Sequence, residues 1–220
     1  MNTKLGKFFL LESKKKSSDL WFNFDFCVFI YSCLHYAARA GHIDILEYLI
    51  VKKSVSPFLI SEVGASILHD AAVKGKLDVI QWLLDNTSLT HSFKDANGAT
   101  LLHLASKFDR SDIVEWILKT HGSSPAKSLT YSGVCCLHFA SASASVKTVK
   151  ALLDAVPNFV NLQMINGVTP VYLAVQENNL RVFKCLMKHG ANLSLRAEDG
   201  MNAIHVACQN GNLELVQLLV

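Results

Sequence analysis

The chain has 220 residues, of which 50% are apolar and 18% are charged, and its formal net charge is +3. This composition is too hydrophobic for a disordered chain, and the longest apolar runs are too short to cross a bilayer, so we expect a soluble, folded protein without a membrane role. Five lysines against three acidic residues place +2 of the charge in residues 1–31, and the remaining +1 over residues 32–220 argues against a nucleic-acid-binding protein.

Residues 1–31 form an atypical leader. A lysine-rich segment precedes the apolar stretch LWFNFDFCVFIY at residues 20–31, and neither matches the sequence that follows. The charged segment ESKKKSSD interrupts the apolar run too early for a signal peptide. We therefore predict a cytoplasmic protein with reduced cysteines. The leader is a misread non-coding segment, a disordered segment or a divergent cap over the first repeat.

Residues 32–220 repeat one pattern six times. Each copy can be aligned on a histidine, or on a tyrosine in the fifth copy, and these anchors are spaced by 34, 34, 35, 34 and 33 residues. The anchors are His35, His69, His103, His138, Tyr172 and His205. The copies cover approximately residues 32–60, 61–94, 95–129, 130–163, 164–196 and 197–220. A period of this length is typical of a solenoid, in which each unit buries its apolar face against its neighbours.

Each copy predicts a turn, a short helix, a bend and a second helix. An alanine two residues after the anchor and large aliphatic residues 14 and 15 after it form an apolar stripe. A glycine stands five residues before every anchor except the first, as a turn with positive φ requires. In five copies a Ser, Thr or Asn three residues before the anchor is a good helix N-cap, and the anchor side chain can reach it as in a capping box. The anchors are therefore expected to be structural.

The bend between the two helices varies among the copies. Six residues after the anchor stand Gly41, Gly75 and Gly211 in three copies, and Asp109, Ala144 and Asn178 in the other three. Side chains at these bends predict either a different backbone geometry or local strain.

The order of a glycine followed by Thr-Pro-Leu-His-x-Ala resembles the ankyrin repeat. The stretches LHDAAVKGKLDVIQWLL (68–84), DANGATLLHLASKF (95–108) and NGVTPVYLAVQENNLRV (166–182) also resemble the espins, which are actin-bundling proteins. The ankyrin resemblance implies an all-α solenoid of about six helix-turn-helix units with short β-turn fingers. The espin resemblance implies a cytoskeletal scaffold that binds the tail of class III myosins, with actin bound only through segments beyond this chain. The alternative is an ankyrin adaptor in intracellular signalling.

We expect no catalytic residues, no cofactor and no metal ion. Motifs for acyl transfer, zinc hydrolysis, phosphate loops and dinucleotide binding do not occur in the sequence. Anchor histidines of adjacent copies should lie about 8–10 Å apart, which is too far to share one ion.

The ankyrin pattern places the turn tips and the ends of the first helices on the concave side of the stack. The predicted partner-binding residues there are Arg39, Lys74 and Lys107 toward the N-terminal end, Phe108, Tyr131 and Ile165 near the middle, and Glu177, Glu198 and Asp199 toward the C-terminal end. This order predicts a peptide partner with an apolar centre between acidic and basic ends. The alternative interpretation is that the charges only solvate an exposed surface.

Overall fold

The computed structural model describes residues 33–219, and these form a row of paired helices. Residues 33–40 are helical and are followed by α3 (Ile43–Glu47) and the π-helical turn η2 (Tyr48–Lys52). The later pairs are α4 (Ile67–Lys74) with α5 (Leu77–Asn86), α6 (Leu101–Lys107) with α7 (Ser111–His121), α8 (Cys136–Ala142) with α9 (Val146–Ala155), α10 (Pro170–Gln176) with α11 (Leu180–Lys188), and α12 (Ala203–Gln209) with α13 (Leu213–Leu219). Two short 3₁₀ turns, η3 (Pro125–Lys127) and η4 (Pro157–Asn161), follow α7 and α9.

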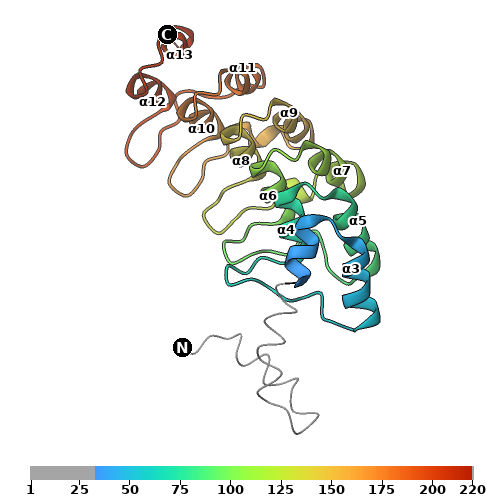
Figure 1. Cartoon of the computed structure of the whole chain (residues 1–220). Helices are drawn as coiled ribbons and strands as arrows, with labels where there is room; N and C mark the ends of the chain where they lie inside the picture. The colour runs from blue at the N-terminus through green and yellow to red at the C-terminus, as the bar shows by residue number, and fades with distance from the viewer. Residues whose placement is uncertain (1–32, 220) are drawn as a thin grey trace, which may run out of the picture.

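The pairs stack into one elongated, curved array (Figure 1). The first helices of the pairs, from α4 to α12, form an inner column, and the second helices, from α3 to α13, form an outer column. Between each outer helix and the next inner helix, the chain projects as a long finger on the side of the inner column. No common globular centre joins the described units, so the predicted all-helical solenoid is confirmed.

The hydrophobic core runs along the whole array between the two columns. Its members include Leu68 and Leu83 in one pair and Leu137 and Leu152 in another, all of which are buried. Leu83 and Leu152, which stand 14 residues after their anchors, are positions of the predicted apolar stripe. Burying one such side chain contributes about 1.5–3 kcal/mol, and the helices contact one another both within a pair, as α4 and α5 do, and between neighbouring pairs, as α6 and α8 do.

The anchor histidines cap their own helices, and His69 and His138 also reach the following finger. The backbone N–H of Ser66 donates to His69 Nδ1 at 3.1 Å, and His69 Nε2 lies 3.0 Å from the Ala99 carbonyl of the following finger. The same capping box forms at α6, α8 and α12, where His103, His138 and His205 take the place of His69. The predicted structural role of these anchors is therefore confirmed.

The N-cap of α8 is a cysteine, the one position at which the sequence lacks a usual N-cap residue. The Cys135 Sγ lies 3.0 Å from His138 Nδ1, so the thiol takes the place of the hydroxyl. In the fifth copy the anchor is Tyr172, and its backbone N–H donates to Thr169 Oγ1 at 3.2 Å. Both helices therefore keep a side-chain cap although their residues depart from the repeat pattern.

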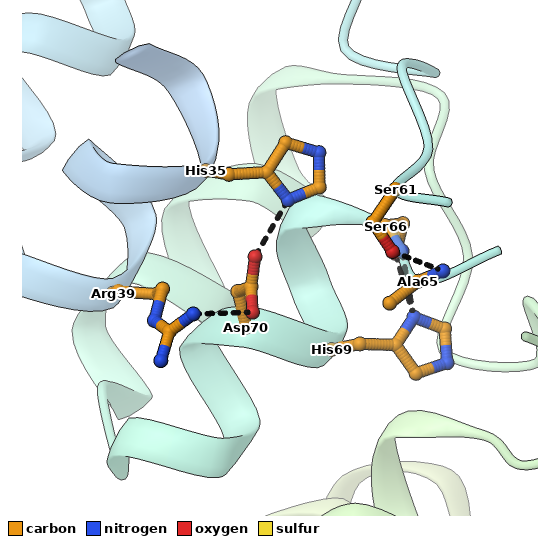
Figure 2. A network of polar contacts seen from close by, with 7 residues as sticks. All are labelled: His35, Arg39, Ser61, Ala65, Ser66, His69 and Asp70. Carbon is orange, nitrogen blue, oxygen red and sulfur yellow. Dashed lines mark hydrogen bonds and ion pairs between the residues drawn. The ribbon is translucent and has the colours of Figure 1, made fainter. Parts of the chain in front are cut away.

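The first anchor also forms a hydrogen bond with the second unit (Figure 2). His35 Nδ1 lies 2.6 Å from Asp70 Oδ2, and the Arg39 guanidinium approaches the other carboxylate oxygen at 3.9 Å. Because Asp70 belongs to α4, this contact holds the helix at residues 33–40 against its neighbour.

The bends without glycine adopt the left-handed conformation. Asp109, Ala144 and Asn178 have φ of 52°, 63° and 58°. Of the two predicted outcomes, local strain is therefore the one that occurs. Asp and Asn tolerate this region better than other residues, so Ala144 carries the largest strain of the three.

We expect Ala144→Gly to raise the free energy of unfolding by about 0.5–1 kcal/mol. The left-handed conformation costs alanine about 1–2 kcal/mol, and glycine removes this cost. Glycine also gives the unfolded chain more conformational entropy, which offsets up to about 1 kcal/mol of the stabilisation. Chemical denaturation measures the change. As a control, Ala151→Gly in the middle of α9 should destabilise by about 1 kcal/mol. If Ala144→Gly instead lowers the free energy of unfolding, Ala144 is not strained in the native structure.

Candidate functional site

The fingers are held in a row by single backbone hydrogen bonds between their tips. The N–H groups of Ala96, Tyr131, Ile165 and Glu198 donate to the carbonyls of Val63, Asn97, Ser132 and Asn166, at 3.2, 3.0, 3.1 and 3.0 Å respectively. Each bond joins one finger to the preceding finger at the same position. As a result, Tyr131, Ile165 and Glu198 occupy equivalent places along one edge of the concave face.

A glycine beside each tip permits this close approach. At Gly98 the backbone has φ of 80°, and a Cβ there would lie 2.9 Å from the Tyr131 backbone nitrogen. The glycine predicted from turn geometry is therefore needed for two reasons, because it also makes room for the next finger.

Gly98→Ala is expected to lower the free energy of unfolding by about 2–3 kcal/mol. The strained φ contributes about 1–2 kcal/mol, and displacement of the Tyr131 amide from its hydrogen bond contributes about 1 kcal/mol. Gly190→Ala is the matched control, because Gly190 has φ of 83° but no atom within 4 Å of an added Cβ. Denaturation curves should show the larger loss for Gly98→Ala. Equal losses for the two variants would mean that the contact between fingers contributes nothing to the free energy of unfolding.

A cavity of about 430 Å³ lies at the centre of the concave face, where α6, α8 and α10 meet the fingers. Val134, Phe139, Met164 and Leu173 supply its apolar lining, and Lys107 and Glu177 supply its charges. Lys107 Nζ lies 5.7 Å and 5.8 Å from the ring centroids of Phe139 and Phe108, within range of a cation–π interaction. The cavity is therefore an apolar pocket with a cation and an anion among its lining residues.

All nine residues predicted to bind a partner are exposed: Arg39, Lys74, Lys107, Phe108, Tyr131, Ile165, Glu177, Glu198 and Asp199. The structure brings Lys107 and Glu177 to the central cavity, and it places Phe108 beside Lys107. Arg39 lies apart, next to Asp70 in the first two units. Asp199 accepts a hydrogen bond from the Met201 backbone and so also stabilises its own finger. A role in partner binding stays a prediction for each of them.

The sequence interpretation missed the apolar lining of the cavity. Phe139 and Leu173 directly follow the anchors His138 and Tyr172. Because the anchor faces the interior, the next residue on the helix points about 100° away, toward the concave side and the preceding unit, as the approach of Lys107 to the Phe139 ring shows. The position after each anchor was therefore a usable signal for these two residues.

The titratable groups under the concave face are held neutral. Burial lowers the pKa of His138 to about 4, although the Val168 and Leu162 backbone carbonyls act in the opposite direction. Burial also raises the pKa of the Cys135 thiol, and it raises the pKa of Cys136 well above its usual value. These thiols are protonated at neutral pH and lack the thiolate that a nucleophile or metal ligand needs.

Residues 33–219 contain neither a clustered metal-ligand set nor a membrane-spanning helix. Within this range, no three His, Cys, Asp or Glu side chains gather closely enough to hold a metal ion. None of the helices in the same part of the chain combines the length and the apolar character needed to cross a membrane.

The family profile described as ankyrin repeats (3 copies) matches the chain at residues 7–92, 34–128, 68–161 and 137–220. The B-cell lymphoma 3 protein homolog of Mus musculus is 32% identical over 101 residues, which cover 46% of this chain and only 22% of that protein. The Notch-regulated ankyrin repeat-containing protein of Xenopus tropicalis is 32% identical over 79 residues, which cover 34% of this chain and 69% of that protein.

A solved structure shares the fold. It is a chain of the complex between the Bd0816 predatory endopeptidase from Bdellovibrio bacteriovorus and the immunity protein Bd3460, with a TM-score of 0.72 and 24% identity, over 84% of this chain and 94% of that one. The profile matches together cover more than half of the chain. The stacked helix pairs and the fingers of the structure agree with these matches. The chain belongs to the ankyrin-repeat family.

Proposed function

We propose that the chain is a protein-binding scaffold whose concave face holds an extended peptide. The observation that supports this proposal best is the central cavity, which offers an apolar lining together with Lys107 and Glu177. Exposed apolar side chains extend the same surface along the array, namely Phe108, Tyr131 and Ile165. A large apolar side chain of a partner can enter the cavity, and desolvated apolar anchors of this kind supply most of the affinity in protein interfaces.

The charges on either side of the cavity suggest the orientation of the peptide. Arg39, Lys74 and Lys107 belong to the first three units, whereas Glu177, Glu198 and Asp199 belong to the last two. An acidic segment of the partner would lie toward the first units and a basic segment toward the last. Exposed charges of this kind contribute more to orientation and association rate than to affinity.

For the partner itself we propose the tail of a class III myosin, in an espin-like scaffold of actin bundles. This choice is supported by the resemblance at residues 68–84, 95–108 and 166–182. A cytoplasmic, cytoskeleton-associated location follows from it, and actin would be bound through segments beyond this chain. The second candidate is an adaptor in intracellular signalling, which the same groove would serve because a fold does not determine a partner.

The test is binding of a class III myosin tail peptide, measured by fluorescence anisotropy. We expect Lys107→Glu and Glu198→Lys each to weaken binding, with at least a tenfold effect, about 1.4 kcal/mol, for Lys107→Glu at the cavity. Lys119→Glu makes the same charge change on the outer helix α7 and should leave binding unchanged. Absence of binding would remove the myosin assignment. If neither Lys107→Glu nor Glu198→Lys changes the affinity, the concave groove is not the binding site.

A further inference from the structure

The first helix pair has an end face that is more exposed than the equivalent face of every later pair. Ten residues after the anchor, Ile45 is 42% exposed, whereas the equivalent residues are at most 1% exposed: Val79, Ile113, Thr148, Val182 and Leu215. Tyr36, directly after the first anchor, is 69% exposed, while Val206 at the same place in the last pair is 3% exposed. Cys33 is likewise half-buried where Ala203 is buried. We call Cys33, Tyr36 and Ile45 the end face.

The last pair shows which neighbour covers these positions. No described pair follows it, yet Leu215, Val206 and Ala203 are buried. Their burial therefore comes from the preceding pair, and the end face of the first pair is the surface on which a preceding unit would pack. A bare apolar end of a solenoid needs a cover, because terminal units otherwise leave core surface in water.

We propose that residues 20–31 of the same chain cover the end face. They join the end face directly, since only Ser32 separates them from Cys33, and they read LWFNFDFCVFIY, which is rich in large apolar side chains. The 32 residues before Cys33 nearly equal one repeat period, and the ankyrin profile begins to match at residue 7. Among the interpretations of the leader, these observations select the divergent cap. This inference does not depend on the proposed partner.

The test uses the full chain and compares thermal midpoints. Ile45→Ser should lower the midpoint by about 5–10 °C, as expected for a covered apolar side chain, and should resemble Val79→Ser at the equivalent buried position. Ile165→Ser is the control for an exposed side chain, because Ile165 is 70% exposed in the structure, and it should change the midpoint by about 1 °C or less. An Ile45→Ser variant that behaves like Ile165→Ser would overturn the proposal.

A second variant identifies the cover. Replacing Phe22, Phe24, Phe26 and Phe29 with serine in the full chain should lower the midpoint, and Ile45→Ser should then have little further effect, because both changes remove the same contact. Fully additive losses would show that the leader does not touch the end face. The end face could instead be covered by a second copy of the chain, and light scattering after size exclusion distinguishes this case. We expect a monomer. A dimer that dissociates in the Ile45→Ser variant would reject the intramolecular cap.

Discussion

Lowering the pH from 7 to about 4 is expected to remove up to about 6 kcal/mol from the free energy of unfolding through two buried histidines. Burial lowers the pKa of His103 and of His138 from 6.5 to about 4. A tenfold change in a proton-binding constant corresponds to about 1.4 kcal/mol, so the full shift of each histidine corresponds to about 3.5 kcal/mol, of which about 3 kcal/mol is lost by pH 4.

The sign of this effect follows from proton uptake. Between pH 6.5 and pH 4 the unfolded chain binds protons at these histidines, whereas the folded chain keeps them neutral. The unfolded state therefore gains stability as the pH falls. The contribution of the two groups is fully present above pH 6.5 and is lost progressively as the pH approaches their folded pKa of about 4.

The capping boxes explain why the folded protein requires the neutral form. His138 Nδ1 accepts the Cys135 backbone N–H at 3.2 Å, and His103 Nδ1 accepts the Thr100 N–H at 3.1 Å. Protonation would place a hydrogen on Nδ1 of each ring, so neither histidine could still accept the backbone N–H of its N-cap residue. Acid would thus uncap α6 and α8 at the centre of the array. The pKa of His69 is also lowered by burial, so α4 should follow in the same direction.

Urea denaturation at pH 7, 6, 5 and 4.5 measures the effect. Replacing His103 and His138 with glutamine should flatten the pH dependence, because glutamine can cap at this position without titrating in this range. His42→Gln is the control, since His42 is exposed and lies outside the capping boxes. A stability that is constant from pH 7 to pH 5, or a slope that survives the double substitution, would contradict this account.

The periodicity of the sequence was sufficient to predict the solenoid, the helix pairs and the role of the anchors. These features depend on residues at fixed distances within one copy, such as Ser66 and His69, and a single chain displays them directly. The positive φ at Gly98 was predictable for the same reason. Even the strain at Ala144 was one of two foreseen outcomes.

Contacts between copies were not predictable in this way. The sequence does not show that Tyr131 bonds to Asn97, or that Lys107 and Glu177 line one cavity, because residues about 34 or 70 positions apart must first be stacked. The π-helical turn at Tyr48–Lys52 was also not foreseen, since its residues fit an ordinary amphipathic helix. The candidate site was therefore predictable as a face of the array, but not as a pocket.

Truncating the leucine before the anchor tests the solenoid itself. The same residue occupies this position in four copies, as Leu34, Leu68, Leu102 and Leu137, and each is at most 1% exposed. We expect Leu102→Ala or Leu137→Ala to lower the free energy of unfolding by about 3–5 kcal/mol, because the lost side chain leaves a cavity in a packed interior.

The position along the array should decide how that loss appears. A defect in α6 or α8 weakens a unit with neighbours on both sides, so the whole transition should shift to lower denaturant. Leu34→Ala lies in the first described pair, so it should also shift the midpoint, and protection from hydrogen exchange should be lost first at residues 33–52. Denaturation curves combined with hydrogen exchange separate the two responses. An equal loss of protection at all described residues in both the Leu34→Ala and Leu137→Ala variants would instead require a single cooperative core, because in a stack of nearest neighbours the unit that carries the defect opens first.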